Sequence, residues 1–373
     1  MKIPSLVLTG LLLAAGFAGC LTTEPAKQNT GNPGTTGGPN SGLTNERLTA
    51  DLTGSGSTFI QPLMTAWTTE YNQLQPGVKA AYGGGGSGQG IKQITEKTTD
   101  FGATDAPMKD EELAKAPGIL HIPASLGGVA VIYNLPGLAA PLKLDAATVA
   151  DIFEARVTRW NDPKITAQNP GVSLPDNPIT VVVRSDGSGT TDTFTTYLAQ
   201  AAASTWTLGK GKTVSWPASV QQAKGNDGVG STVKNNPYTV GYAGSEWAFV
   251  QEIQMAHLKN KAGKYVAPTI AAISAGANEG VGTLAADTRG TLVDPPGDAS
   301  YPIVALVWLL AYKEQADEAK GKALVDFLWY ATHEGQELAD RDPLTYAPLP
   351  PALVQKGEQM IKSITYAGKP IKA

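Results

Sequence analysis

Residues that hold metals and disulfides are scarce in this sequence. A single cysteine, Cys20, and three widely separated histidines stand among 373 residues. One cysteine excludes a disulfide framework and a cysteine-rich metal site, and so few histidines argue against a histidine-rich zinc site. His333 and Glu334 begin an HExxH pattern of the metalloprotease type, but Glu337 occupies the position where the second histidine is required. The sequence therefore predicts no bound metal.

Charged residues are also few, at 17% of the chain, and neither sign dominates. The 29 lysines and arginines stand against 33 aspartates and glutamates, which gives a formal net charge of −4. A mildly acidic chain excludes a broad basic surface for nucleic acid or anionic lipid, although it leaves open an anion held by local donors. With 42% hydrophobic residues the chain is too apolar to be disordered, and its length predicts two domains.

No hydrophobic run near the N-terminus is long enough to span a bilayer, which takes about 20 apolar residues. The apolar run over residues 3–18 follows Met1-Lys2 and is interrupted by polar residues, proline and glycine. A weakly basic start, a short apolar core and small residues before a cleavage point are typical of a secretory signal peptide. Phe17-Ala18-Gly19-Cys20 resembles a bacterial lipobox, in which the cysteine is acylated. We expect residues 1–19 to be a lipoprotein signal peptide and Cys20 to be lipidated; the alternative is a buried free cysteine.

The next segment, residues 20–48, is expected to be a flexible tether. Residues 21–46 are rich in Thr, Pro, Gly and Asn and contain almost nothing apolar. Such a stretch cannot bury enough surface to offset the entropy lost on ordering. The predicted layout is therefore signal, anchor, tether and a globular body that starts near residue 49.

The body alternates helical and strand-like patterns, which predicts an α/β class with sheets rich in parallel strands. Apolar residues recur on one helical face over residues 59–74. The run over residues 303–311 has no polar face, so it predicts a core strand covered on both sides. Further helices are expected at residues 148–153, 194–198 and 323–330, the first capped by Asp145, and further strands at 129–133, 179–183 and 240–243.

Loops of glycine, serine and threonine recur just before predicted helices. They cover residues 54–58, 83–90 and 186–191, and a fourth run at 228–232 lies inside a weaker helical pattern. Glycines let the backbone approach a ligand, and the first turn of a helix offers unpaired N–H groups and partial positive charge. Three such loops favour an anion pocket built mostly from neutral donors, although each alone is more typical of a tight turn and cap. We interpret the fourth run as a turn or cap.

Other motifs for phosphate binding and catalysis are incomplete or absent in the sequence. Gly211-Lys212-Thr213 ends like a P-loop, but Trp206 stands where the leading glycine is required. No G-x-S-x-G nucleophile elbow occurs in the sequence. The glycine run at 83–90 is not followed by an acidic residue in the context of a dinucleotide fold. The sequence indicates no nucleotide and no other cofactor.

Charged residues beside the loops are candidates for ligand contacts. Arg184 follows a predicted strand, where a guanidinium can bind an oxyanion through two hydrogen bonds, and Asp186 could pair with it. Asp105 ends another short strand. The alternatives are a surface ion pair for Arg184 and an ordinary turn or N-cap for Asp105, and spacing alone does not separate them.

At these residues the sequence resembles the substrate-binding protein of the bacterial high-affinity ABC phosphate importer, the PstS family. The Arg-x-Asp-Gly-Ser-Gly-Thr loop at 184–190 and the Asp-Phe-Gly-Ala-x-Asp-Ala-Pro stretch at 100–107 are the most specific matches. Gln89 departs from the family pattern, in which glycine is usual, and Ser55 and Ser57 stand where alanine is common. The other matching stretches, in family order within about residues 50–350, are 52–59, 82–94, 160–163, 197–198, 225–228 and 241–242.

The resemblance implies a two-lobed, type II periplasmic-binding-protein fold that closes on phosphate about a hinge. Asp186 would orient Arg184, and no catalytic residue is implied. Lobe one is expected over residues 49–126 and 299–373, and lobe two over residues 127–298. The phosphate contacts carried over from the family are Thr58, Phe59, Ser87, Asp105, Arg184, Ser188, Gly189 and Thr190.

The function implied is that of a lipid-anchored, extracytoplasmic receptor. It would bind inorganic phosphate as a monomer and deliver it to the transmembrane subunits and ATPase of an ABC permease. Two alternatives stay open: an extracytoplasmic phosphatase on the same scaffold, and a phosphate-responsive sensory or adhesion protein. The absence of a nucleophile elbow, a metal cluster and a histidine near the glycine loops favours the receptor over the phosphatase.

Overall fold

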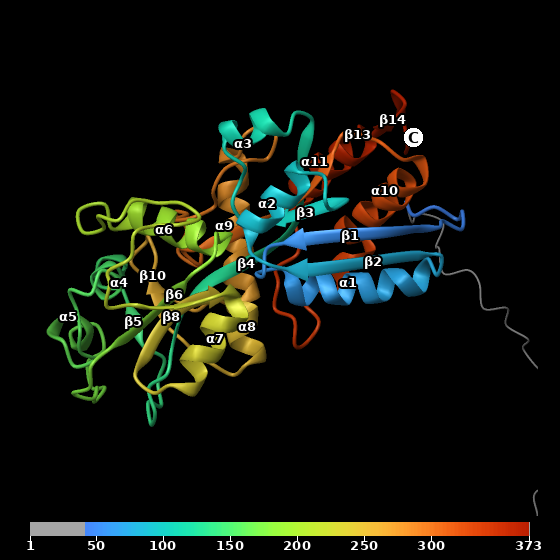
Figure 1. The fold of residues 1–373 in the computed structure, drawn as a ribbon. Coiled ribbons are helices and arrows are strands. Elements are labelled where there is room, and N and C mark those ends of the chain that lie inside the picture. The colour runs from blue at the N-terminus through green and yellow to red at the C-terminus, as the bar shows by residue number, and fades with distance from the viewer. Residues whose placement is uncertain (1–41, 373) are drawn as a thin grey trace, which may run out of the picture. The chain divides into compact units, whose positions relative to one another are not determined.

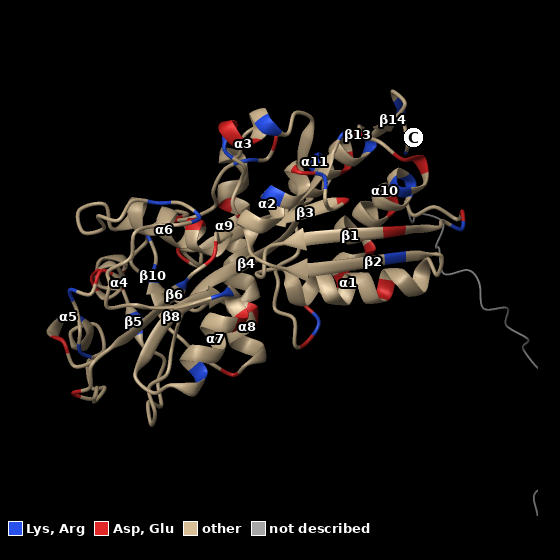
Figure 2. Cartoon of the chain, in the orientation of Figure 1, with Lys and Arg blue, Asp and Glu red and all other residues tan. Residues whose placement is uncertain are grey.

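The computed structural model describes residues 42–372. The predicted signal peptide, Cys20 and the first part of the predicted tether lie outside the described residues. Among residues 42–372, none of the helices has the length and apolar character needed to cross a membrane. Basic and acidic residues are interspersed along the described elements (Figure 2).

Strands and helices alternate along most of the chain (Figure 1). The strands are β1 (Ala50–Gly56), β2 (Val78–Gly84), β3 (Phe101–Thr104), β4 (Ile119–Tyr133), β5 (Lys143–Leu144), β6 (Thr180–Arg184), β7 (Gln221–Ala223), β8 (Thr239–Gly244), β9 (Gln254–Met255), β10 (His257–Lys259), β11 (Tyr265–Val266), β12 (Val304–Tyr312), β13 (Glu314–Gln315), β14 (Thr365–Tyr366) and β15 (Lys369–Pro370). The helices are α1 (Gln61–Leu74), α2 (Ser87–Thr95), α3 (Asp110–Lys115), α4 (Ala146–Phe153), α5 (Pro163–Thr166), α6 (Gly189–Ala201), α7 (Gly225–Asn235), α8 (Ser245–Val250), α9 (Ile270–Gly280), α10 (Glu318–Thr332) and α11 (Pro351–Lys362), with 3-10 turns η1 (Val281–Thr283) and η2 (Glu334–Leu338).

The main sheet has the strand order β2-β1-β3-β12-β4-β8-β6-β7, and β9 also pairs with β4. Its outer pairs are parallel: β1 with β2 and β3, and β6 with β7 and β8. Its centre is antiparallel, because β12 runs against both β3 and β4, and β4 runs against β8. The expectation of parallel-rich sheets is therefore right for the flanks and wrong for the centre.

One strand, β4, joins the two parts of this sheet. Its residues up to Gly128 pair with β12, and its residues from Val129 onward pair with β8. We call β2, β1, β3 and β12 the first half-sheet, and β8, β6 and β7 the second half-sheet. Strand β12 is buried along almost its whole length, which confirms the expectation that both of its sides are covered.

The helices that the sequence predicts are present, for identifiable reasons. Helix α1 buries the apolar face predicted from its periodicity, and Trp67 on that face donates its indole N–H to the carbonyl of Gly335 at 2.7 Å. Helix α4 begins at the predicted cap, where the Asp145 side chain accepts a hydrogen bond from the Thr148 N–H at 2.8 Å. The expected helices at residues 194–198 and 323–330 lie within α6 and α10.

Candidate anion-binding site

The three glycine loops that the sequence singled out come together in the fold. The N–H groups of Gly85 and Gly86, in the second loop, donate to the carbonyl of Gly56 at the end of β1, at 2.9 and 2.8 Å. In the same loop, the N–H of Gly88 donates to the carbonyl of Gly187 at 2.8 Å. Gly187 belongs to the loop between β6 and α6. This last bond therefore connects the loop that follows β2, in the first half-sheet, to the loop that follows β6, in the second half-sheet.

Asp105 lies where two helix N-termini meet. It directly follows β3 and is only 3% exposed. One carboxylate oxygen accepts from Ser87 Oγ at 2.6 Å, and the other accepts from Thr190 Oγ1 at 3.0 Å. Ser87 begins α2 and Thr190 lies in the first turn of α6, so Asp105 faces partial positive charge from both helices. The arrangement places one buried acceptor among hydroxyl and backbone donors.

Arg184 ends β6 and is 4% exposed. Its Nε and Nη2 donate to the two carboxylate oxygens of Asp186 at 2.8 and 2.5 Å, which forms the pair that the spacing suggested. Its Nη1 lies 3.4 Å from Thr190 Oγ1. Burial acts to raise the pKa of Asp186, but the hydrogen bonds and charge of Arg184 outweigh it and hold that pKa below its ordinary value. The guanidinium is thus fixed in direction beside the α6 N-terminus.

Ser188 and Gly189 form the start of α6. The Ser188 side chain caps the helix by accepting from the Thr191 N–H at 3.0 Å. The first N–H groups of a helix have no partner within it, so those of Gly189 and Thr190 have the geometry to donate to an anion. A Cβ built on Gly189 would lie 2.3 Å from an Asp105 oxygen, so only glycine fits this close approach.

Thr58 contacts a residue that the sequence analysis did not assign. Its Oγ1 accepts from both the backbone N–H and the side-chain amide of Asn226, each at 3.0 Å, and that amide also lies 3.2 Å from Thr190 Oγ1. Asn226 is fully buried in the first turn of α7. The Gly-Asn-Asp-Gly stretch at 225–228 was the available signal, because it matched the PstS pattern. The run at 228–232, interpreted as a turn or cap, lies in the interior of α7, so that interpretation is wrong.

Phe59 sits beside Thr58, but its backbone groups bond within the protein. Its N–H donates to Ser57 Oγ at 3.0 Å, and its carbonyl accepts from the hydroxyl of Tyr346 at 2.7 Å. Its buried ring packs against Gly127 of β4, where an added Cβ would lie 2.6 Å from the ring. Phe59 therefore fixes the first loop to the central strand.

Glu246, in α8, is a buried carboxyl that sequence reasoning did not single out. It is fully buried, and within residues 42–372 neither of its carboxyl oxygens has a hydrogen-bond partner. Burial raises its pKa well above the ordinary value, with a smaller contribution from the charge of Asp105. Burial therefore disfavours the charged form of this carboxyl.

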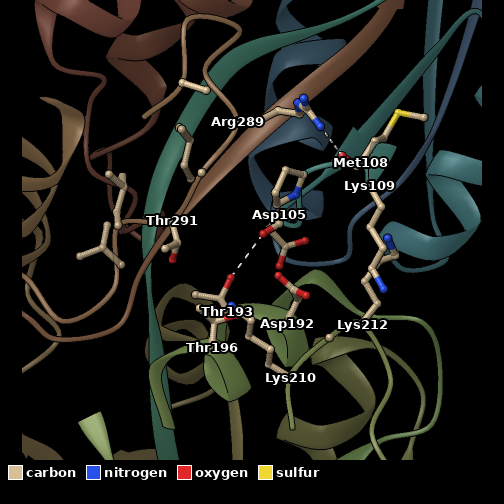
Figure 3. A pocket seen from close by; sticks show the side chains of 17 residues that line it. Asp105, Met108, Lys109, Asp192, Thr193, Thr196, Lys210, Lys212, Arg289 and Thr291 are labelled. Carbon is tan, nitrogen blue, oxygen red and sulfur yellow. Dashed lines mark hydrogen bonds between the residues drawn. The ribbon is translucent and has the colours of Figure 1, made fainter. Parts of the chain in front are cut away.

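A cavity of about 580 Å³ adjoins the site on the side of Asp105 (Figure 3). Asp192 faces Asp105 there, and burial raises the pKa of Asp192, although the charge of Lys212 acts in the opposite direction. Cationic side chains and apolar wall residues share the lining: Lys109, Lys210, Lys212, Arg289, Leu292, Val304 and Leu306.

His121 on β4 supports the segment that carries Asp105. It is 3% exposed, and its Nε2 accepts from the backbone N–H of Met108 at 3.1 Å. Burial lowers the pKa of His121 to about 4, with a smaller contribution from the charge of Arg289. The folded protein therefore holds this imidazole neutral over the range in which an unfolded chain protonates it.

This burial predicts a pH dependence of stability. Because the unfolded chain binds a proton at His121 below about pH 6.5 and the folded protein does so only near pH 4, the free energy of unfolding should fall by about 3 kcal/mol as pH drops across this window. Urea unfolding at several pH values would measure it. His121→Gln, which keeps an acceptor for Met108, should lose this part of the slope, and parallel pH profiles for the two proteins would contradict the prediction.

Comparison with known proteins identifies the class. The model of the PBP superfamily domain matches residues 28–331. The subatomic-resolution structure of a high-affinity periplasmic phosphate-binding protein, PfluDING, bound with phosphate, superposes with a TM-score of 0.68 at 22% identity, covering 83% of this chain and 93% of that one. The structure of an ABC-type phosphate transport receptor from Vibrio cholerae superposes with a TM-score of 0.53 at 19% identity, covering 80% and 100%. The chain has the two-lobed α/β fold of the periplasmic binding proteins, which confirms the predicted fold class.

Sequence similarity narrows the class to one family. The phosphate-binding protein PstS of Pasteurella multocida is 40% identical over 308 residues, which are 82% of this chain and 88% of that protein. PstS of Xylella fastidiosa is 38% identical over 310 residues, covering 82% and 84%. The chain belongs to the PstS family of phosphate-binding proteins.

Proposed function

We propose that this protein binds inorganic phosphate in the site around Asp105 and delivers it to an ABC-type phosphate permease. The observation that carries the proposal is the position of Asp105, a buried acceptor between two hydroxyl donors, Ser87 at the start of α2 and Thr190 at the start of α6. Phosphate near neutral pH carries a proton that such a carboxylate accepts in a hydrogen bond, while Arg184 and the α6 N-terminus supply donors to its other oxygens. Membership of the PstS family supports the same ligand.

The proposed contacts are those carried over from the family, with one addition. Ser87 and Thr190 donate to Asp105, and Arg184 contacts Thr190. Thr58 is linked to Thr190 through Asn226, and Ser188 and Gly189 form the α6 N-terminus. Phe59 is retained as a proposed contact next to Thr58. Asn226 joins the set because its amide contacts both Thr58 and Thr190.

The proposed lobes meet at this site. We assign residues 49–126 and 299–373 to lobe one and residues 127–298 to lobe two, with the hinge where they join. The change of partner along β4, from β12 to β8 at Gly128 and Val129, lies close to the first of these boundaries. Ser87 and Asp105 then belong to lobe one, and Arg184 and Thr190 to lobe two, so closure brings the contacts together.

Binding rather than catalysis is proposed. The side chains that bond around Asp105 are hydroxyls, an amide and an arginine, and general base catalysis most often uses a histidine. Purified protein should therefore leave a chromogenic phosphate ester unhydrolysed. Calorimetry with phosphate and sulfate tests the function directly: binding of phosphate without binding of sulfate supports it, and heat from neither anion overturns it.

We further propose that the protein acts as a monomer outside the cytoplasm, held to a membrane by a lipid on Cys20. Cys20→Ala should leave phosphate binding intact and move the protein to the soluble fraction of its native host. Two or more acyl chains anchor firmly, so the wild type should stay with the membranes through a salt wash. Fractionation followed by immunoblotting measures the location of the wild type and of the variant. A wild type found wholly in the soluble fraction would contradict the lipid anchor.

A further inference from the structure

An ion pair connects two segments that reach the site from opposite sides. Lys212 Nζ lies 2.8 and 2.9 Å from the two carboxylate oxygens of Glu112, although the residues are 100 positions apart in the chain. The side chains are 14% and 28% exposed, so water screens this pair less than it screens a fully exposed one. Lys212 also lines the cavity beside Asp105 (Figure 3).

The lysine end of the pair is fastened to the α6 side of the site. The carbonyl of Lys212 accepts a hydrogen bond from the N–H of Ser188 at 2.9 Å. Ser188 is the cap of α6, and Gly211 next to Lys212 donates its N–H to Thr195 Oγ1 within α6 at 3.1 Å. A displacement of Lys212 is therefore transmitted to the start of α6.

The glutamate end is fastened to the Asp105 side. Glu112 lies in the first turn of α3, and its carboxylate also accepts from the Lys109 N–H at 2.8 Å. Between Asp105 and α3, the backbone of Met108 is held on both sides, by His121 at its N–H and by Arg289 at its carbonyl at 3.0 Å. Glu112 is thus attached to the Asp105 segment through a short and well-supported connection.

From this geometry we propose that Lys212 and Glu112 are positioning residues of the phosphate site, a proposal that rests on the proposed function. Their ion pair holds the α6 N-terminus against the Asp105 segment and slows the release of bound phosphate. It forms only when the two segments are together, so it acts after capture. The pair therefore affects the dissociation rate and leaves the association rate unchanged.

The test measures both rates with radiolabelled phosphate. Complexes of the purified protein are chased with excess unlabelled phosphate and filtered over time, for the wild type, Glu112→Gln, Lys212→Gln and the double variant. Each single variant should release phosphate about fivefold faster, with an unchanged association rate, and the double variant no faster than either single one. Lys322→Gln is the matched control, because its pair with Glu318 at 3.1 Å lies within one helix, α10; it should release phosphate at the wild-type rate.

The outcomes separate this proposal from the one it rests on. A wild type that retains labelled phosphate, with single variants that release it at the same rate, overturns the positioning role and leaves phosphate binding standing. Additive effects in the double variant also overturn it, because independent residues do not share one contact. A wild type that retains no labelled phosphate overturns the proposed function itself.

Discussion

Replacing Arg184 with alanine is expected to weaken phosphate binding by about two orders of magnitude or more. The guanidinium is a buried, charge-assisted donor, and removing such a partner typically costs a few kcal/mol of binding free energy. The same change removes the two hydrogen bonds that the Asp186 carboxylate accepts from the guanidinium and leaves it only the N–H of Gly225, next to the proposed anion site. Repulsion between the Asp186 carboxylate, which has lost its ion-pair partner, and phosphate then adds to the loss of the arginine contact. Calorimetric titration with phosphate measures the effect.

Two further variants give that experiment its controls. Arg184→Lys should restore only part of the affinity, because an ammonium group cannot donate to both oxygens of Asp186 in the same forked geometry. Arg159→Ala removes an arginine that pairs with Asp176 at the surface, where the two side chains are 51% and 64% exposed, and should bind phosphate like the wild type. An unchanged affinity in Arg184→Ala would place this arginine outside the site.

Asp105→Asn is expected to narrow the preference for phosphate over sulfate. The two anions are nearly equal in size and shape, so the proton that phosphate retains near neutral pH is the feature by which they differ. A buried carboxylate can accept a hydrogen bond from that proton, which stabilises bound phosphate. Sulfate has no such proton, so it leaves the carboxylate without this hydrogen bond and binds more weakly. An asparagine keeps the shape but can turn an N–H toward the ligand. The ratio of affinities should fall by about 10- to 100-fold.

Titrations of both anions at neutral pH decide the role of Asp105. Asp192→Asn is the matched control, since this carboxyl lies beside that of Asp105 in the lining of the adjoining cavity (Figure 3). Asp192 should be dispensable for selectivity, because the hydroxyls of Ser87 and Thr190 orient Asp105 and Asp192 takes no part in these hydrogen bonds. An Asp105→Asn protein as selective as the wild type would assign the discrimination to another residue.

The fold was predictable where local pattern determines it. The apolar face of α1 and the Asp145 cap of α4 carry their own signals in spacing and residue type. The antiparallel centre of the sheet was not predictable in this way. An apolar run such as β12 has the same composition whichever way its neighbours run, so the direction of pairing depends on residues far away in the chain.

The candidate site was predictable to the extent that it is built from local loops. Arg184 and Asp186 lie two residues apart at a strand end, so their pairing follows from the sequence. Asn226 and Glu246 were missed for different reasons. Asn226 sits in a glycine-rich stretch that is typical of a turn, and its contacts come from chain segments remote in sequence. Glu246 belongs to a short helix where an acidic residue usually faces solvent, and only the packing around it makes it buried.

The shared strand β4 has a consequence for how the protein folds. Strand β4 contributes hydrogen bonds to both half-sheets. If one half-sheet lost its pairing with β4, the backbone groups of β4 that face it would be left unpaired. We therefore expect folding and unfolding to be coupled across the molecule, with the two halves unfolding as one cooperative unit in spite of the fold's two lobes.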